Sequence, residues 1–402
     1  MILPTHDARS EHLLARRDKK MARSPDAYVR GNTVLFYEWL NGQRGHSLPE
    51  GPAVWICGDC HVGNLGPLGD AEGNVKLQIR DLDQALIGNP VHDLVRLSLS
   101  LAMAARGSRV SGVVTARMLE HVMQGYYQAF VSGGDKEQVE QPKAVRWVVR
   151  KAVERSWKQL AKERIADMRP TIPLGRDFWP LSRREKSGMM KLFENPEVLK
   201  LVRTLESRSD DAPVEVLDAA YWVKGCSSLG LLRYAVLLGV GDKKNGEYCL
   251  IDIKQAVKAA APRYRDVSIP RDNAHRVVQG ARHLSPALGE RMVAQRFMDH
   301  DVFLRELLPQ DMKLEINQLT LQDTTIVAHY LAYVVGRAHA RQMDDGARKR
   351  WRVELNRDRG KTLAAPTWLW KSVVQLVADH ESGYLEHCRK YALALESVRP
   401  AR

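Results

Sequence analysis

Apolar residues along this chain recur at two different spacings, and the spacing changes near residue 215. Before that point, apolar positions repeat every three to four residues, which is the pattern of helices that bury one face or more. Helices are predicted over residues 24–41, 92–106, 110–131 and 141–165. The segment 92–106 is apolar on most sides, so we expect it to lie in the core of the helical part.

Beyond residue 215 the apolar runs are shorter, richer in β-forming residues and separated by glycine-rich breaks. They predict strands at 219–223, 231–238 and 248–253. Helical spacing returns at 325–342 and at about 368–396. Because 402 residues are too many for one ordinary core, we predict an α+β fold with two lobes. The predicted parts are a mainly helical lobe at 1–212, a β-rich lobe at 213–310, and helices at 311–402 that pack on the first lobe.

Two short strands are also predicted inside the first part, and they frame a polar loop. Ala53–Cys57 is an apolar run that breaks at Gly58, and Val75–Ile79 alternates apolar with polar residues. The stretch 63–73 between them is rich in turn-forming residues, so we expect turns there. The strands would bring the polar loop and the acidic segment after the second strand to the same end of a sheet.

The composition is that of a folded, soluble protein, with 44% hydrophobic and 27% charged residues. A formal charge of +13 favours anionic partners, which include nucleic acid, phospholipid headgroups and phosphorylated small molecules. Basic runs are more often a solvated face, so nucleic acid is a possible partner but not the favoured one. No run approaches the roughly 20 apolar residues of a membrane span. We therefore expect a cytoplasmic protein with no membrane contact.

Five cysteines, a small and odd number, favour reduced thiols over a disulfide framework. Cys57 and Cys60 have the spacing of zinc and redox motifs, but no second pair completes a four-ligand zinc site. Both are expected to pack as small apolar residues.

The polar loop carries residues that suit phosphoryl transfer. That reaction needs a carboxylate to orient the attacking hydroxyl, and oxygen ligands that hold magnesium on the nucleotide phosphates. Asp59 and Asn64 stand five positions apart, as their counterparts do in the kinase catalytic loop, and Asp81 follows the second strand. Asp59 would orient the hydroxyl or accept its proton, while Asn64 and Asp81 would bind the metal. The spacing also occurs in ordinary loops, so the prediction depends on its conjunction with the two strands.

The segments Gly58-Asp-Cys-His-Val-Gly-Asn64 and Asp81–Leu94 resemble the hallmark segments of aminoglycoside and choline kinases, a branch of the protein-kinase-like superfamily. More widely, Arg17–Gly31, the Gly58 segment and Ala338–Arg341 are similar to a bacterial family catalogued only as a domain of unknown function. This resemblance covers most of the chain. It implies a protein-kinase-like two-lobe fold that uses ATP and magnesium, and it does not supply the substrate.

Carried over position by position, the resemblance makes Asp59 the catalytic aspartate and Asn64 and Asp81 the metal ligands. His61 stands where these kinases often have a histidine, which makes it a second catalytic candidate; a loop histidine bonded to the backbone is an equal alternative. Asp83 is a candidate third metal ligand, or an acid that supports the ligands.

Two further residues are expected to be structural. By the same resemblance, Asp93 corresponds to a buried aspartate that supports the fold. His339 shares an apolar helix face with Val335, so we expect a hydrogen-bonded core histidine there.

A kinase also needs a glycine loop over the nucleotide phosphates and a lysine, and both occur late in this chain. Lys224–Gly230 lies between two predicted strands, and Lys254 ends the strand that follows, which is the order found in kinases. We therefore predict a circularly permuted order, with Phe303–Leu308 as a strand leading to the adenine-binding hinge. The residues predicted to bind the nucleotide are Gly225, Ser227, Ser228, Gly230 and Lys254. A plain hairpin turn and a surface lysine are the alternatives.

The sequence does not offer Lys254 its usual partner. The kinase lysine pairs with a helical glutamate, whereas the helix expected near 273–284 holds Gln279. Either Glu290 substitutes for it, or a neutral amide replaces the charge-assisted pair and weakens activity.

The leading hypothesis is an ATP- and magnesium-dependent phosphotransferase acting on a hydroxyl of an unidentified small molecule or anionic acceptor. Two alternatives remain open. The first is a nucleotidyl transferase that moves AMP. The second is a kinase-like pseudoenzyme that binds nucleotide or nucleic acid, which the net charge and Gln279 favour.

Overall fold

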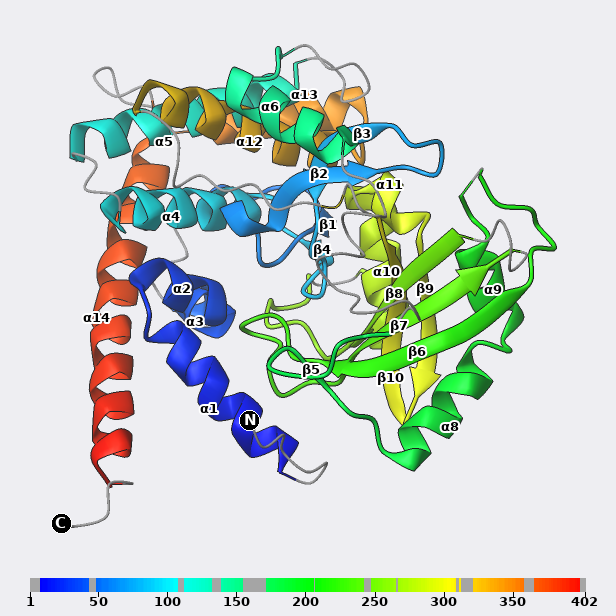
Figure 1. Cartoon of the computed structure of the whole chain (residues 1–402). Coiled ribbons are helices and arrows are strands. Elements are labelled where there is room, and N and C mark those ends of the chain that lie inside the picture. The colour runs from blue at the N-terminus through cyan, green and yellow to red at the C-terminus, as the bar shows by residue number, and fades with distance from the viewer. Residues whose placement is uncertain are drawn as a thin grey trace.

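The computed structural model describes most of the chain, and its helices and strands confirm an α+β fold (Figure 1). The described residues are 8–42, 48–107, 112–131, 139–154, 171–205, 207–241, 247–264, 267–308, 311, 321–357 and 365–397. Within these ranges no helix has both the length and the apolar character needed to cross a bilayer. The predicted lobe boundaries at 212 and 310 stay predictions.

Long helices form the core of the part that carries the Asp59 segment. They are α4 (Val91–Gly107), α5 (Gly112–Ala129), α12 (Leu321–Ala340) and α14 (Thr367–Ser397). Small residues let α5 and α12 approach closely, because a Cβ at Gly125 would lie 2.0 Å from the His329 carbonyl oxygen, and one at Gly336 would lie 2.8 Å from Tyr126 O. Shorter helices α6 (Lys143–Glu154) and α13 (Asp345–Leu355) complete this layer. The rest of the predicted helix 141–165 lies outside the described residues.

The N-terminal segment forms three helices, α1 (Arg9–Met21), α2 (Pro25–Gly31) and α3 (Thr33–Asn41). The single helix predicted at 24–41 is therefore wrong. Ser24 caps α2 as its sequence suggests, but Asn32 leaves the helical conformation and its side chain accepts a hydrogen bond from Leu35 N. An asparagine that can cap a new helix competes with continuing the old one.

A six-stranded antiparallel sheet forms the β-rich part, in the spatial order β5-β6-β7-β8-β10-β9. Its strands are β5 (Phe178–Trp179), β6 (Val214–Trp222), β7 (Arg233–Val240), β8 (Glu247–Gln255), β9 (Met292–Phe297) and β10 (His300–Leu307). The three strands predicted after residue 215 and the strand expected at 303–308 are confirmed. Helices cover both faces.

Alternate residues of β10 show which helices lie on which face. Val302 and Leu304 share a core with α8 (Arg183–Leu192) and α9 (Pro196–Val202), whereas Phe303 packs with α10 (Asn273–Leu284). Lys254 on β8 is directly opposite Phe303 in the ladder, so it points to the α10 face. Figure 1 shows α10, followed by α11 (Pro286–Gly289), between this sheet and the short strands of the Asp59 segment.

Those short strands form two separate ribbons. β1 (Val54–Ile56) pairs with β4 (Leu86–Gly88), and β2 (Leu65–Gly69) pairs with β3 (Val75–Ile79). The expectation that the first and second predicted strands share one sheet is therefore wrong, as is the all-turn assignment of 63–73. Only residues 70–73 make the turn, where Asp70 accepts a hydrogen bond from Asn74 N, while β2 is fully buried despite its glycines and proline.

Candidate functional site

The Asp59 loop, residues 58–64, is shaped by Asp93 at the start of α4. The Asp93 carboxylate accepts hydrogen bonds from Cys57 N at 2.7 Å and from Gly58 N at 3.0 Å. Gly58 has φ of +74°, and a Cβ there would lie 2.3 Å from the Gln84 carbonyl oxygen. Only glycine fits such a position. The chain therefore turns sharply at the end of β1 and presents Asp59.

Asp93 in turn belongs to a buried network that reaches α5 and α12. His339 Nε2 lies 3.1 Å from Asp93 Oδ2, and His339 Nδ1 lies 2.8 Å from the Tyr126 hydroxyl. All three side chains are buried. The predictions of a structural Asp93 and a hydrogen-bonded core His339 are confirmed. Buried polar groups with every partner in place fix one geometry.

The carboxylate of Asp59 is held by an arginine that sequence reasoning did not single out. Arg96 on α4 donates from Nε at 3.1 Å and from Nη2 at 2.9 Å to Asp59 Oδ1, and also to Val29 O. Asn64 Nδ2 donates to the Asp59 carbonyl at 2.9 Å. Arg96 is fully buried. The available signal was an arginine in the middle of a largely apolar helix, since a buried cation needs a carboxylate partner.

The second oxygen of Asp59 faces His61. His61 Nε2 lies 3.9 Å from Asp59 Oδ2, too far for a direct hydrogen bond. Burial lowers the pKa of His61 to about 4, so the ring is neutral near pH 7. Its Nδ1 is buried and has no hydrogen-bond partner among the described residues. His61 and the second oxygen of Asp59 thus form a small polar surface beside the loop.

Asp81 and Asp83 share the ammonium of Lys254. Lys254 Nζ lies 3.0 Å from Asp81 Oδ1, 3.2 Å from Asp83 Oδ1 and 3.1 Å from Asp83 Oδ2. Burial would raise the pKa of Asp81, but Lys254 holds it well below its usual range. Burial and the charge of Asp81 raise the pKa of Asp83 to about 7. Two carboxylates therefore share one ammonium group, so one negative charge has no cation beside it when both carboxylates are ionised.

This charge imbalance suits a divalent cation. Magnesium is commonly held by one or two carboxylates, with water and substrate phosphates completing its shell. The amide nitrogen of Asn64 is occupied by Asp59 O, which leaves its side-chain oxygen as the ligand atom. The backbone bond from Arg80 N to Asn64 O, at 2.7 Å, places Asn64 and Asp81 at neighbouring ends of the β2–β3 ribbon. In the described part of the chain no cluster of three or more His, Cys, Asp or Glu side chains is arranged for a metal.

The glycine loop, residues 224–230, connects β6 and β7 as a hairpin. Gly225 and Gly230 have φ of +102° and +106°, and a Cβ at Gly225 would lie 2.3 Å from Ser228 Oγ. The same Cβ would be 3.8 Å from Arg233 Nη1, and Arg233 is paired with Lys254 in the sheet. The loop and Lys254 are therefore at the same end of the sheet. Ser227 lies in the turn between the two glycines.

Neither Gln279 nor Glu290 takes the place of the expected glutamate. Lys254 bonds to the two aspartates instead, and Glu290 is exposed at the end of α11. The residue of α10 that reaches the acidic segment is Arg276, which donates to the Asp83 carbonyl at 3.0 Å and to Val257 O. Arg276 thus fixes the backbone of Asp83 rather than its carboxylate.

Next to Lys254 in the sheet, a buried aspartate pairs with two arginines. Asp252, two residues earlier on β8, is fully buried and accepts hydrogen bonds from Arg233 and Arg305 at 2.6–3.1 Å. Although burial would raise the pKa of Asp252, the two guanidinium groups hold it well below its usual range. Arg305 also donates to Arg80 O, beside Asp81. The sheet therefore contacts the acidic segment in two ways, through the hydrogen bond from Arg305 to the Arg80 carbonyl and through the ion pairs of Lys254.

The family model described as an uncharacterized protein conserved in bacteria (DUF2252) matches residues 9–390. The chain belongs to this family. No curated protein and no solved structure matches it. The matched range of the DUF2252 chain runs from the first residue of α1 into α14, so it contains every site residue described above.

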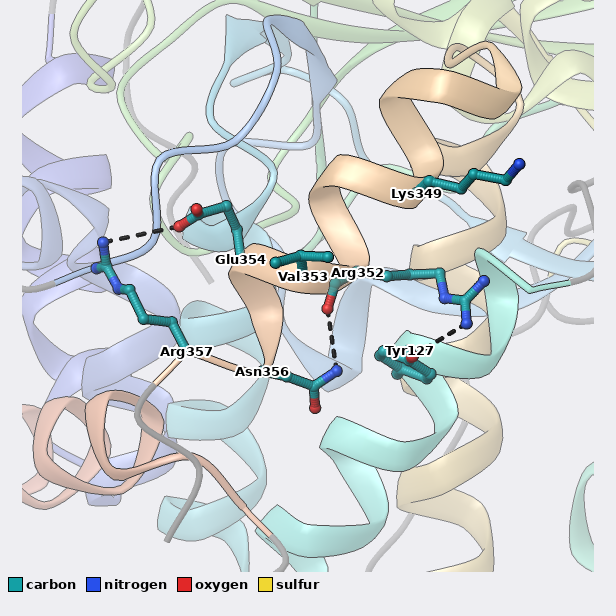
Figure 2. A pocket seen from close by; sticks show the side chains of 7 residues that line it. All are labelled: Tyr127, Lys349, Arg352, Val353, Glu354, Asn356 and Arg357. Carbon is teal, nitrogen blue, oxygen red and sulfur yellow. Dashed lines mark hydrogen bonds and ion pairs between the residues drawn. The ribbon is translucent and has the colours of Figure 1, made fainter.

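A pocket elsewhere on the DUF2252 chain lies at α13 and does not include the predicted site residues (Figure 2). It is lined by Tyr127, Lys349, Arg352, Val353, Glu354, Asn356 and Arg357. Two of its cations already have partners, since Arg352 donates to the Tyr127 hydroxyl at 3.1 Å and Arg357 lies 3.7 Å from Glu354. Nothing in this pocket corresponds to the candidate chemistry of the Asp59 loop.

Proposed function

We propose that this chain is an ATP- and magnesium-dependent phosphotransferase with a protein-kinase-like, circularly permuted arrangement. The observation that carries the proposal is the contact of Lys254 with Asp81 and Asp83. It joins the lysine that follows a glycine loop to the acidic segment that follows the Asp59 loop. A phosphate-binding lysine and metal-binding carboxylates must meet in this way around a nucleotide.

Each residue then has a specific task. Asp59 orients the acceptor hydroxyl through Oδ2, while Arg96 fixes the carboxylate through Oδ1. Asp81 and Asn64, with Asp83 beside them, hold magnesium, which when bound neutralises charge on the nucleotide phosphates. With Asp81 and Asp83 holding the metal, Lys254 would be free to contact a nucleotide phosphate instead. The glycine loop lets backbone N–H groups approach the phosphates.

The order of elements along the chain supports a protein-kinase-like arrangement. The glycine loop lies between β6 and β7, Lys254 is on β8, and α10 follows, which is the sequence of parts in a kinase nucleotide lobe. Here that lobe comes after the Asp59 loop instead of before it. A chain with the catalytic part first has the connectivity of a circular permutant.

Two substitutions test this proposal. Asp59→Asn should retain binding of magnesium and a non-hydrolysable ATP analogue but lose ATP turnover, whereas Asp81→Ala should lose the magnesium-dependent binding. Calorimetry and a coupled ADP assay across a library of hydroxyl compounds measure the two effects. Asp299→Asn, at an exposed aspartate that pairs with Arg184 and not with the site residues, is the control. Unchanged turnover in Asp59→Asn would rule the proposal out, and mass analysis of products separates phosphate transfer from AMP transfer.

A kinase-like pseudoenzyme is the second candidate, and two observations favour it. The double hydrogen bond from the buried Arg96 occupies Oδ1 of Asp59, which leaves only Oδ2 to meet an acceptor hydroxyl. Gln279 also stands where an active kinase has glutamate. Nucleotide binding without turnover of any acceptor, with salt-sensitive binding to RNA or DNA, would support this candidate.

A further inference from the structure

The C-terminal end of α2 lies between the glycine loop and the Asp59 loop. A Cβ at Gly31 would be 3.1 Å from Cys226 Sγ in the glycine loop, and a Cβ at Gly63 would be 3.7 Å from Arg30 Nη1. Lys20 on α1 also donates to the Gly225 carbonyl at 2.8 Å. The N-terminal helices therefore bring their own side chains to the place where the two loops approach each other.

Those side chains are strongly basic. Four cations lower the pKa of the Cys226 thiol, although burial of the thiol outweighs them and raises it. They are Lys20, Arg30, Arg17 and Arg23; together they are called the basic cluster. Arg17 Nε is buried and has no hydrogen-bond partner among the described residues. A partly desolvated group of like charges favours binding of an anion.

The carboxylates near the basic cluster make only weak ion pairs with its guanidinium groups. Asp26 lies 3.5 Å from Arg30 Nη1, and Asp18 lies 3.6 Å from Arg17 Nε, both at or beyond the limit of a hydrogen bond. Burial raises the pKa of Asp26 despite the neighbouring Arg30, so this carboxylate is not strongly held by its partner. A phosphate with three acceptor oxygens would bind these guanidinium groups better.

Position distinguishes the basic cluster from the nucleotide side of the site. Lys254, Asp81 and Asp83 meet on the face of the six-stranded sheet. Arg30 instead lies beside Gly63, and its charge contributes to lowering the pKa of His61. Oδ2 of Asp59 is directed to this same side of the loop, toward His61. An acceptor whose hydroxyl reaches Oδ2 would extend toward Arg30.

We propose that the acceptor is a phosphate-bearing small molecule whose phosphate is bound by Arg30 and Arg17 between the glycine loop and the Asp59 loop. This inference rests on the proposed phosphotransferase function, and it deepens it by naming the acceptor class. Lys20 positions the glycine loop, and Arg23 adds positive charge at the edge of the site.

The test uses glycerol 2-phosphate as the probe and the full chain without metal or nucleotide. Phosphorus NMR titration should show binding that Arg30→Gln and Arg17→Gln each weaken by about 10-fold, the usual loss for a charge-assisted hydrogen bond. Lys19→Gln removes the same charge from an exposed position of α1 and should change the affinity by less than about twofold. Equal losses in all three variants would mean non-specific attraction and overturn the proposal.

A second arm separates this proposal from the nucleotide site. Glycerol 2-phosphate should bind with unchanged affinity when magnesium and a non-hydrolysable ATP analogue saturate the protein, and Lys254→Met should weaken only the analogue. Mutual exclusion of the two ligands would assign the basic cluster to the nucleotide phosphates and overturn the proposal. If the analogue never binds while Arg30-dependent phosphate binding persists, the phosphotransferase function fails and the anion site remains.

Discussion

Lys254 Nζ lies 3.0 Å from Asp81 Oδ1, although 173 residues separate them in the chain. The contact joins β8 of the large sheet to the segment that follows β3. It leaves Asp83, only two residues away, sharing the same ammonium. The pair is therefore a compact acidic site whose charge is only partly balanced by a residue from another part of the molecule.

The raised pKa of Asp83 predicts a pH dependence of stability. Burial and Asp81 raise this pKa from 3.8 to about 7, so between these values the folded protein holds a proton that the unfolded chain has released. The free energy of unfolding must then fall as the pH rises from about 4 to about 7, by up to ~1.4 kcal/mol per unit of pKa difference. Asp81 has a lowered pKa, so its protonation changes the free energy of unfolding only below this pH window.

Asp83→Asn should flatten the profile over that window, as measured by urea unfolding at a series of pH values. Asp299→Asn, whose carboxylate is exposed, should follow the wild-type curve. If the Asp83→Asn and wild-type profiles remain parallel, the carboxylate does not carry the proton. Magnesium and nucleotide binding near pH 6.5 should also release a proton in the wild type, seen as a dependence of the calorimetric enthalpy on the buffer.

Gly58→Ala is expected to disrupt the Asp59 loop. A methyl group there meets the Gln84 carbonyl at 2.3 Å, and a positive φ adds backbone strain. We expect a loss of more than about 2 kcal/mol in the free energy of unfolding, measured by urea denaturation. Gly73→Ala is the matched control, because Gly73 also has a positive φ, +85°, but no atom lies within 4 Å of its Cβ position. It should cost only about 1 kcal/mol of backbone strain. Equal losses in the two variants would mean that the contact with Gln84 is unimportant.

Local patterns in the sequence were enough to predict many of the elements. Val75–Ile79 alternates apolar and polar residues and is β3, and the apolar segment 92–106 is the core of α4. β2 was missed because Gly66, Pro67 and Gly69 have the composition of a turn, yet burial and pairing with β3 override that preference. Pairing partners are set by tertiary contacts, so the separation of β1 from β3 could not be read from either strand.

The candidate site shows the same division between local and distant information. The spacing of Asp59 and Asn64 marks the loop in the sequence, and a hydrogen bond from the Asn64 side chain to the Asp59 carbonyl joins the two residues in the structure. Arg96 was not found, because its carboxylate partner is distant in sequence. A buried arginine is a reliable sign that some carboxylate is near, but the sequence does not say that this carboxylate is Asp59.

Asp93→Asn should destabilise the protein by about 2–4 kcal/mol in urea denaturation at pH 7. The carboxylate accepts hydrogen bonds from two backbone N–H groups and faces His339, and an amide can supply only one oxygen for these roles. The same substitution at Asp345, an exposed aspartate in the first turn of α13, should change the free energy of unfolding far less. A similar small loss for Asp93→Asn would show that the loop does not depend on this carboxylate.

The ion pair of Arg96 with Asp59 predicts strong coupling between the two residues. Arg96→Met leaves a buried carboxylate without its cation and should cost about 3–5 kcal/mol, whereas Asp59→Asn together with Arg96→Met removes both charges and should recover part of that loss. A double-mutant cycle by urea denaturation should give a coupling energy above about 1 kcal/mol. Additive losses would mean that Asp59 does not rely on Arg96. The argument for a pseudoenzyme from this ion pair would then be lost.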